Sequence, residues 1–220
     1  MKKSKLRVAL DILLLLTFVA GLGAAGYYYW VRLDEQPVVE EEVILHTDSG
    51  GLDLEAMLQA AKNTPAGPDL PEWSPTGLSN RWQYITVHHS GSLSGNSAIF
   101  DADHRKRGMN NGLGYHFVIT NGYGGEDGHI EIGPRWTKQL DGGHLKGDDI
   151  NKISIGICLV GDFTKAPPTA KQIASLKALL KHLMKITLLT PGQIKPHREM
   201  PHQATDCPGS LPVALIVQNL

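Results

Sequence analysis

The sequence predicts an α/β domain in which a mixed central β-sheet is flanked by helices. Three segments support this fold class: a stretch rich in β-branched and aromatic residues at 84–89, an apolar run at 154–160, and an amphipathic stretch at 170–185. The first two have the composition of strands, and the third has the 3.6-residue repeat of a helix. Strands and helices mixed along one chain are typical of a sheet that carries helices on its faces.

Four strands are expected in the globular part, which begins near Trp82. They cover residues 84–89, 115–120, 129–133 and 154–160. The last of these is almost continuously apolar, which is typical of a strand covered on both faces, so we expect it at the centre of the sheet. Successive side chains of a strand point to opposite faces, so His88 and His89 cannot project into the same cleft.

Two helices with clear start or stop signals are expected between and after these strands. The first covers residues 97–107 and ends before Gly108, a common residue at helix ends. The second covers residues 170–185 and begins at Thr169, which forms a Thr-x-x-Gln capping box with Gln172. The remaining segment, residues 190–220, is rich in proline and glycine and is expected to be rich in turns.

The N-terminus carries a candidate membrane-spanning segment. Several basic residues between Lys2 and Arg7 precede an apolar run from Ile12 to Trp30. As a helix at ~1.5 Å per residue this run would cover roughly 28 Å, close to the thickness of the hydrocarbon core of a bilayer. Basic residues before the span predict a cytoplasmic N-terminus. We therefore expect a single-pass protein of the inner (cytoplasmic) membrane whose C-terminal domain lies outside the cytoplasm, on the periplasmic or cell-wall side.

A cleaved signal peptide is the alternative interpretation of this segment, because Gly23 and Ala25 form a small-x-small site. The aromatic residues at 27–30 favour an uncleaved anchor, since aromatic side chains gather at the membrane interface. The expected organisation is a cytoplasmic basic tip and anchor at residues 1–31, an acidic, Pro/Gly-containing tether at 32–80, and a domain at 81–220. Within the tether, residues 52–63 have helical spacing and could form a short helix.

The composition of the chain limits the classes of function that are possible. The chain has 220 residues, of which 41% are hydrophobic, so it can bury a sizeable core. Its 21 Lys and Arg residues nearly balance its 22 Asp and Glu residues, and it lacks the basic excess that phosphate binding requires. Nucleic acid is therefore not an expected partner. Only two cysteines occur, which excludes a disulfide-rich scaffold and leaves a single bridge or a metal thiolate.

Three residues could together bind a metal ion. Catalytic zinc usually takes three protein ligands and keeps a fourth position for water. His88 ends a predicted strand, and His197 and Cys207 lie in one proline-containing segment, close enough along the chain to reach the same ion. Each also has a structural alternative, because a strand histidine is commonly held by hydrogen bonds and a cysteine commonly fills a small buried space. Cys207 lies in a turn, whereas Cys158 lies inside an apolar strand and is expected to pack in the core.

Five motifs occur in a fixed order along the domain. They are Val87-His88-His89-Ser90, Gly114-Tyr115-His116-Phe117, Gly143-His144, Ser154-Ile155-Gly156-Ile157 with Gly161-Asp162-Phe163, and His197 followed by Cys207-Pro208-Gly209. Together they resemble the type 2 N-acetylmuramoyl-L-alanine amidases, a family that includes phage lysozymes and the peptidoglycan recognition proteins. The resemblance covers about residues 82–215, and its strength comes from the order of the motifs, since each alone is a weak signal.

The resemblance implies a zinc-dependent hydrolase that cuts the amide bond between N-acetylmuramic acid and L-alanine in peptidoglycan or muropeptides. Position by position, it implies that Zn²⁺ is bound in a surface cleft by the three candidate ligands, His88, His197 and Cys207. Tyr115 falls where the family places a tyrosine near the reacting water, and His144 falls at a position associated with the substrate groove. His104 also matches a family histidine, but a packing role is expected for it.

Two departures from the family pattern sharpen these expectations. Some members carry a lysine two residues before the last ligand, whereas this chain has Thr205, which can donate a hydrogen bond but carries no charge. Another branch places a glutamate base in the strand that corresponds to residues 157–160, where this chain has Cys158 and Val160. The chain therefore resembles the branch that uses a tyrosine, with Tyr115 and Thr205 as the catalytic residues.

Two other functions are compatible with the same residues. A membrane-tethered receptor could bind peptidoglycan without cutting it, with the metal serving only to hold a loop. A different zinc hydrolase could act on small peptides or amides that lack the muramyl sugar. The complete set of three ligands favours the amidase, because relatives that only bind typically lack one of them.

Overall fold

The computed structural model describes residue 59 and residues 73–220, and the fold is given for these residues. One five-stranded sheet has the strand order β3-β2-β4-β1-β5. The strands are β1 (Tyr84–His89), β2 (Phe117–Ile119), β3 (Ile130–Ile132), β4 (Ser154–Leu159) and β5 (Ile194–Pro196). Pairs β2–β4, β4–β1 and β1–β5 are parallel, and β3 is antiparallel to β2. The sheet is therefore mixed, as the sequence predicts, and β4 lies at its centre.

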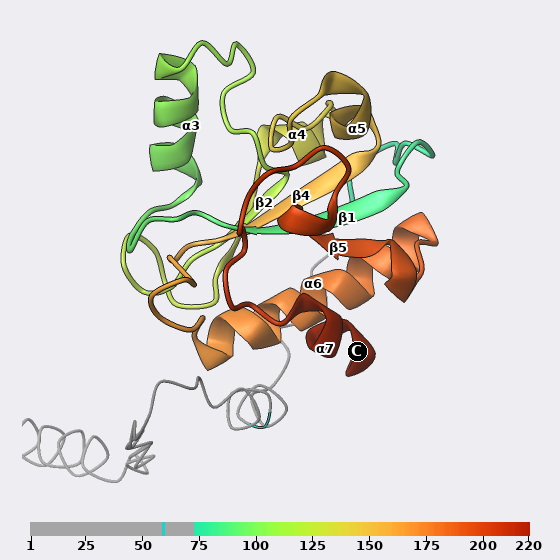
Figure 1. Cartoon of the computed structure of the whole chain (residues 1–220). Coiled ribbons are helices and arrows are strands. Elements are labelled where there is room, and N and C mark those ends of the chain that lie inside the picture. The colour runs from blue at the N-terminus through green and yellow to red at the C-terminus, as the bar shows by residue number, and fades with distance from the viewer. Residues whose placement is uncertain (1–58, 60–72) are drawn as a thin grey trace, which may run out of the picture. The chain divides into compact units, whose positions relative to one another are not determined.

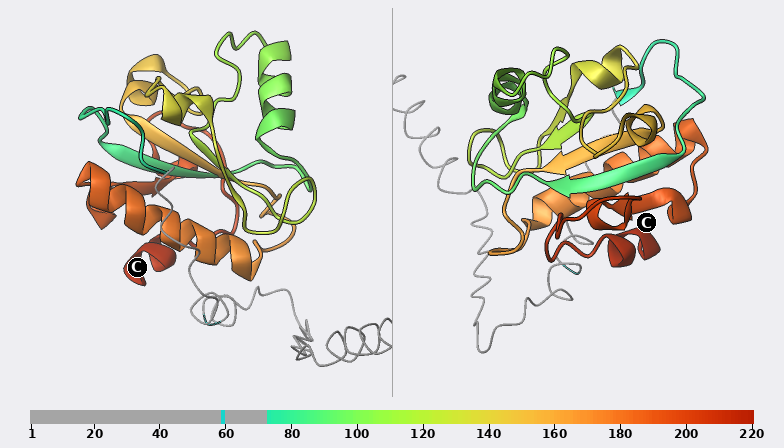
Figure 2. Two further views of the ribbon diagram at one scale, coloured as in Figure 1. Left: turned by 180° about the vertical axis from the view of Figure 1, so that it is seen from behind. Right: turned by 45° about the horizontal axis from the view of Figure 1, so that its top comes forward.

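Helices lie on both sides of the sheet. They are α3 (Ser97–Lys106), α4 (Pro134–Thr137), α5 (Asp148–Lys152), α6 (Ala170–Thr187) and α7 (Val213–Gln218), with the 3-10 turns η2 (Pro191–Gln193) and η3 (His197–Glu199). Figures 1 and 2 show α6 and α7 against one face of the sheet and α3, α4 and α5 on the opposite side. This is the expected α/β architecture.

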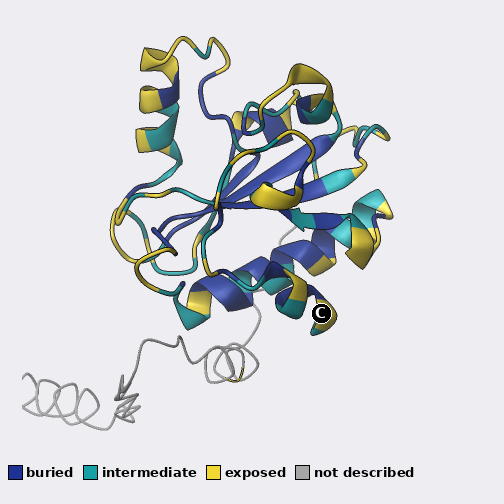
Figure 3. Cartoon of the chain, viewed as in Figure 1, coloured by how far each residue is buried: buried dark blue, intermediate teal, exposed yellow. Residues whose placement is uncertain are grey.

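The main hydrophobic core lies between the sheet and the pair α6 and α7. Alternate residues of β1 and β4 point into it, including Ile85, Val87, Ile155 and Ile157, all fully buried. Strands β2 and β4, in the middle of the sheet, and the inner side of α6 are buried, as Figure 3 shows. Each fully buried Ile or Leu side chain contributes about 1.5–3 kcal/mol. This packing buries one face of the sheet.

The other face of the same two strands carries small and polar residues. Because side chains alternate along a strand, the residues between the core positions project away from α6. These residues are Thr86 and His88 from β1 and Ser154, Gly156 and Cys158 from β4; Thr86 lies opposite Gly156, and His88 lies opposite Cys158. A functional site that uses His88 must therefore lie on this face.

Helix α6 begins as the sequence predicts. The Thr169 hydroxyl oxygen accepts a hydrogen bond from the Gln172 backbone N–H at 3.0 Å, and the Gln172 side-chain oxygen accepts from the Thr169 N–H at 3.1 Å. The capping box is thus complete. The helix extends slightly beyond the predicted end, to Thr187, and stops where Leu188 adopts a left-handed conformation.

Residues 190–220, which we expect to be rich in turns, also form two regular elements that the sequence patterns do not predict. The segment holds β5 and α7. Strand β5 is only three residues long, ends in Pro196, and pairs with the distant strand β1, so no local alternation announces it. Helix α7 has no side-chain cap at its start and is held by burial of Val213, Ile216 and Val217. Tertiary packing, which local sequence patterns do not report, forms both elements.

Among the described residues, none belongs to a helix with the length and apolar character that crossing a membrane requires. The predicted span at residues 12–30 lies outside the described part, as does nearly all of the predicted short helix at 52–63. Both stay predictions. Trp73, from the segment assigned to the tether, is buried in the core, and its carbonyl accepts a 2.7 Å hydrogen bond from the Trp136 indole N–H.

Candidate metal centre

Three neighbouring chain segments bring the candidate ligands together. His88 is near the end of β1, His197 follows directly after the adjacent parallel strand β5, and Cys207 lies in the loop beyond. The rings of His88 and His197 are 4.4 Å apart between centroids. One ligand atom from each of the three residues lies within 4.8 Å of the others. The convergence that the sequence could only suggest is therefore present in the structure.

The spacing of these atoms suits a four-coordinate zinc ion. The Cys207 Sγ atom lies 3.9 Å from the His88 Nδ1 atom. Zinc bonds of about 2.0–2.3 Å in tetrahedral geometry place neighbouring ligand atoms about 3–4 Å apart. Nitrogen and sulfur donors favour zinc, whereas calcium and magnesium favour oxygen donors. Two imidazoles and one thiol therefore suit zinc better than calcium or magnesium. The residues present therefore fit a zinc site with three protein ligands.

Hydrogen bonds determine which nitrogen of His88 faces the other ligands. Its Nε2 atom lies 3.0 Å from the His144 Nδ1 atom, and the His144 Nε2 atom lies 3.2 Å from the Ser154 carbonyl oxygen. A carbonyl oxygen can only accept, so the His144 Nε2 carries a hydrogen and its Nδ1, in a neutral ring, accepts. The His88 Nε2–H must then donate, which leaves the His88 Nδ1 lone pair toward Cys207.

A second hydrogen bond orients His197 in the same way, with its Nε2 atom toward a neighbouring side chain. The His197 Nε2 atom lies 3.1 Å from the Gln203 Oε1 atom. The Gln203 side-chain nitrogen donates to the carbonyls of Lys146 and Pro201, which assigns the oxygen to the side of His197. The His197 Nε2 is therefore the donor, and its Nδ1 has a free lone pair. Both histidines thus have Nδ1 available to bind a metal ion.

Burial keeps the imidazoles of this site neutral. It is the largest cause that lowers the pKa of His88 well below its usual value, followed by the neighbouring imidazoles of His144 and His197. Burial also lowers the pKa of His144 to about 3 and raises the pKa of the Cys207 thiol to about 11. Neutral imidazole is the form that binds metals, whereas the thiol must lose its proton, so metal binding at Cys207 releases one.

Tyr115 and Thr205, the two predicted catalytic residues, lie beside the ligands. The Tyr115 ring is 5.3 Å from the His88 ring, and burial, followed by the thiols of Cys158 and Cys207, raises the pKa of its hydroxyl well above the usual value. The phenol therefore keeps its proton and can donate a hydrogen bond. The Thr205 hydroxyl oxygen accepts from the Cys207 backbone N–H at 3.1 Å, and its own proton can still be donated.

His144 is the predicted site residue whose surroundings were least expected. It is 9% exposed, and its ring nitrogens are directed to His88 and Ser154. Sequence reasoning missed Gln203 altogether, because a single glutamine in a loop carries no local signal. His104 is not part of the group of candidate ligands; it is buried, and its Nδ1 accepts from the Gly114 N–H at 2.8 Å, as expected of a packing residue.

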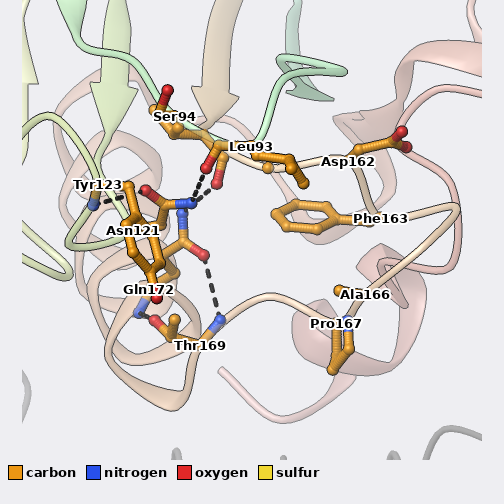
Figure 4. Close-up of a pocket in the computed structure, with 12 residues that line it drawn as sticks. Leu93, Ser94, Asn121, Tyr123, Asp162, Phe163, Ala166, Pro167, Thr169 and Gln172 are labelled. Atoms are coloured by element: carbon orange, nitrogen blue, oxygen red, sulfur yellow. Dashed lines mark hydrogen bonds between the residues drawn. The ribbon is translucent and has the colours of Figure 1, made fainter.

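A cavity of about 440 Å³ lies apart from the three ligands, at the carboxyl end of β4. Figure 4 shows Leu93, Tyr123 and Phe163 around it, with the buried amide of Gln172 at its wall. That amide donates to two backbone carbonyls, so it has no unsatisfied donor to offer a ligand. Phe163 links the cavity to the surroundings of the metal centre: its N–H donates to the His89 Nδ1 atom, and its carbonyl accepts from Ser210 in the turn after Cys207.

Fold and site together define the class: an α/β domain with a candidate two-histidine, one-cysteine metal centre on one face of its sheet. The family model for N-acetylmuramoyl-L-alanine amidase matches residues 78–210. The chain belongs to this family. All of the ligand residues, and both predicted catalytic residues, lie within the matched region.

Among curated proteins, the chain is similar to peptidoglycan recognition protein 1 of Rattus norvegicus. The two are 31% identical over 144 residues, which is 64% of this chain and 76% of the relative. Among solved structures, it is similar to the amidase LysC of Clostridium intestinale URNW, with 31% identity and a TM-score of 0.54 over 66% of this chain and 91% of that one. The endolysin amidase LysCS of the same organism gives 31% identity and a TM-score of 0.53, over 66% of this chain and 89% of that one.

Proposed function

We propose that this chain is a zinc-dependent amidase that hydrolyses the amide bond between N-acetylmuramic acid and L-alanine in peptidoglycan or muropeptides. The observation that carries the proposal is the convergence of His88, His197 and Cys207, with the Nδ1 atoms of both imidazoles left free for a metal. Family membership supports the choice of this reaction. Bound at these three residues, zinc would activate water as the nucleophile and polarise the scissile carbonyl.

The protein's own residues supply orientation and hydrogen bonds. The Tyr115 Oη atom holds its proton, because burial raises its pKa, so it acts as a donor that orients the water or the developing oxyanion rather than as a base. Thr205 offers a second hydroxyl proton from the turn that carries Cys207. A preorganised donor to an oxyanion is worth about 3 kcal/mol of transition-state stabilisation.

The proposal is tested with the purified chain and purified peptidoglycan. Hydrolysis releases stem peptides with a new L-alanine amino terminus, which chromatography and mass spectrometry detect. A strong chelator should stop the release, and added Zn²⁺ should restore it. Peptide release that continues at full rate in the chelator would contradict zinc dependence, and cleavage only of short peptides lacking the muramyl sugar would point to a different zinc hydrolase.

A receptor without catalysis is the second candidate. The 31% identity to a peptidoglycan recognition protein favours it, because that relative is named for recognition rather than hydrolysis. The two candidates differ in one observable. Chelator-insensitive binding of the chain to peptidoglycan with no released peptide would establish the receptor, whereas release at catalytic turnover establishes the amidase.

Residues 12–30 are proposed to anchor the domain in the inner (cytoplasmic) membrane, with the domain outside the cytoplasm. The apolar run and the basic residues before it support this orientation. In fractionated cells, an uncleaved anchor keeps the intact chain in the membrane fraction, and protease reaches the domain only from outside the cytoplasm. A mature protein whose first residue lies after position 25 would establish the signal peptide instead.

A further inference from the structure

Hydrogen bonds connect the loop at residues 142–147 to both candidate histidine ligands. From this loop, the His144 side chain reaches His88, and the Lys146 backbone reaches Gln203, which in turn contacts His197. His88 is on β1 and His197 follows the adjacent strand β5, but the hydrogen bonds that orient both side chains lead back to this one loop. This arrangement makes the loop a candidate for setting the geometry of the metal centre.

The His144 ring is held closely on both sides. Its Nε2–H donates to the Ser154 carbonyl, and its backbone N–H donates to Asn151. Two glycines make room for the imidazole: a Cβ atom added at Gly156 would lie 2.4 Å from the His144 Cδ2 atom, and one added at Gly142 would lie 2.6 Å from its Nε2 atom. The ring therefore has little freedom to turn, so the His144 Nδ1 atom, which accepts from His88, is held in place.

Gln203 is fixed to the same loop by a pair of backbone contacts. The Gln203 side-chain oxygen accepts from the Lys146 N–H at 2.9 Å, and its nitrogen donates to the Lys146 carbonyl at 3.0 Å. The same oxygen lies 3.1 Å from the His197 Nε2 atom. The orientation of His197 thus depends on where the backbone of the loop lies.

Asn151 holds the loop itself. Its side-chain oxygen accepts from the N–H groups of His144 and Leu145, and its nitrogen donates to the carbonyls of Leu145 and Gly147, with distances from 2.8 to 3.1 Å. Asn151 is 5% exposed, and these four bonds use the full capacity of its amide. A buried amide saturated in this way specifies one backbone conformation.

We propose that His144, Gln203 and Asn151 are positioning residues. Through them, the loop at 142–147 holds both imidazoles with Nδ1 toward the metal. This inference rests on the proposed function, because it takes His88 and His197 as zinc ligands. In this proposal, His144 positions His88 and does not bind the substrate. Groups that orient metal-bound histidines typically change metal affinity by about 10- to 100-fold when they are removed.

A matched pair of substitutions tests the His144 contact. Asn carries a polar atom near the position of the imidazole Nδ1, so His144→Asn keeps an acceptor for the His88 Nε2–H, whereas His144→Leu does not. Both variants lose the bond to Ser154, so their difference isolates the contact to His88. Zinc affinity is measured by competition with a chromogenic chelator, and the ligand field is measured by the absorption of the Co²⁺ form. Thermal unfolding of the zinc-free forms shows whether each variant folds.

We expect His144→Leu to weaken zinc binding about 10- to 100-fold and to alter the Co²⁺ spectrum, and His144→Asn to stay within about threefold of the parent chain. Equal zinc affinity in the parent and both variants would overturn the inference. So would a His144→Leu variant in which only KM for muropeptide rises, because that result makes His144 a substrate contact. Failure of the parent chain itself to bind zinc would overturn the proposed function, which is a distinguishable result.

A remote substitution tests the role of the loop. Asn151 does not contact His88 or His197 in the hydrogen bonds of the described residues, yet Asn151→Ala is expected to weaken zinc binding about tenfold. If Asn151 acts through His144, its effect shrinks in the His144→Leu background, because coupled residues are not additive. If the effects of Asn151→Ala and His144→Leu on the free energy of zinc binding are fully additive, Asn151 does not act through His144.

Discussion

His88 lies opposite Cys158 in the parallel pairing of β1 with β4, so both side chains project from the same face of the sheet. The two residues nevertheless differ in role. His88 presents Nδ1 to Cys207, whereas Cys158 packs with Leu113 and Val118 in a small hydrophobic cluster that also contacts Tyr115. Burial, followed by the nearby Cys207 thiol, raises the pKa of the Cys158 thiol far above its usual value, so it stays protonated.

Cys158→Ala is expected to lower the free energy of unfolding by about 1 kcal/mol, because it removes one methyl-sized group from a packed cluster. Zinc affinity should stay unchanged, since the Cys158 thiol is not a ligand. Denaturant unfolding of the zinc-free chain and chelator competition measure the two quantities. A loss of bound zinc in this variant would mean that the chain uses both of its cysteines as ligands.

Gly156→Ala is expected to weaken zinc binding although Gly156 is not a candidate ligand. The new methyl group would lie 2.4 Å from the His144 ring, which must then shift away from His88. We expect a loss of affinity of about tenfold, on the scale of other lost contacts to a metal-bound histidine. Gly192→Ala is the control, because the nearest atom to its added Cβ is 3.9 Å away. Unchanged affinity in Gly156→Ala would show that the site tolerates a displaced His144.

Elements with a strong local sequence pattern, and the residues on them, could be predicted from the sequence. The alternation of a strand separates His88 from His89, and the structure places His89 toward Phe163, whose N–H donates to the His89 Nδ1 atom at 3.0 Å. The apolar run at 154–160 correctly predicted a central buried strand, and the Thr-x-x-Gln box marked the start of α6. These features follow from local periodicity and capping, which involve neighbours in the chain.

The supporting contacts could not be predicted in the same way. The bond that His88 donates to His144 joins residues 56 positions apart, and the bonds between Gln203 and Lys146 span 57 positions. No periodicity relates such residues, because the fold alone brings them together. Strand β5 was missed for a similar reason, since its pairing with β1 supplies the hydrogen bonds that its own three residues cannot provide.

Tyr115→Phe is expected to lower kcat about 100-fold and to leave zinc affinity unchanged. The substitution removes only the hydroxyl proton that we assign to the water or the oxyanion, and single donors of this kind contribute about 10²- to 10³-fold. Steady-state kinetics on a muropeptide measures the effect. Tyr123→Phe, at an exposed tyrosine beside the separate cavity, is the control and should keep full activity. A normal kcat in Tyr115→Phe would remove Tyr115 from the mechanism.

Thr205 is tested by comparing Val with Ser at that position. Val is close to Thr in shape but has no hydroxyl, so Thr205→Val loses both the bond from the Cys207 N–H and the proposed donor, whereas Thr205→Ser keeps them. We expect kcat to fall at least about tenfold in Thr205→Val and to change less than about threefold in Thr205→Ser. If both variants match the parent, the oxyanion is stabilised without Thr205.

The central claim is that Cys207 completes a zinc centre that hydrolyses peptidoglycan. Its most direct test is the release of stem peptides from purified peptidoglycan by Cys207→Ala, with Cys158→Ala as the same substitution at the only other cysteine of the chain. We predict that Cys207→Ala loses zinc and releases no peptide, whereas Cys158→Ala retains zinc and still releases peptide. Undiminished release by Cys207→Ala would contradict the zinc mechanism.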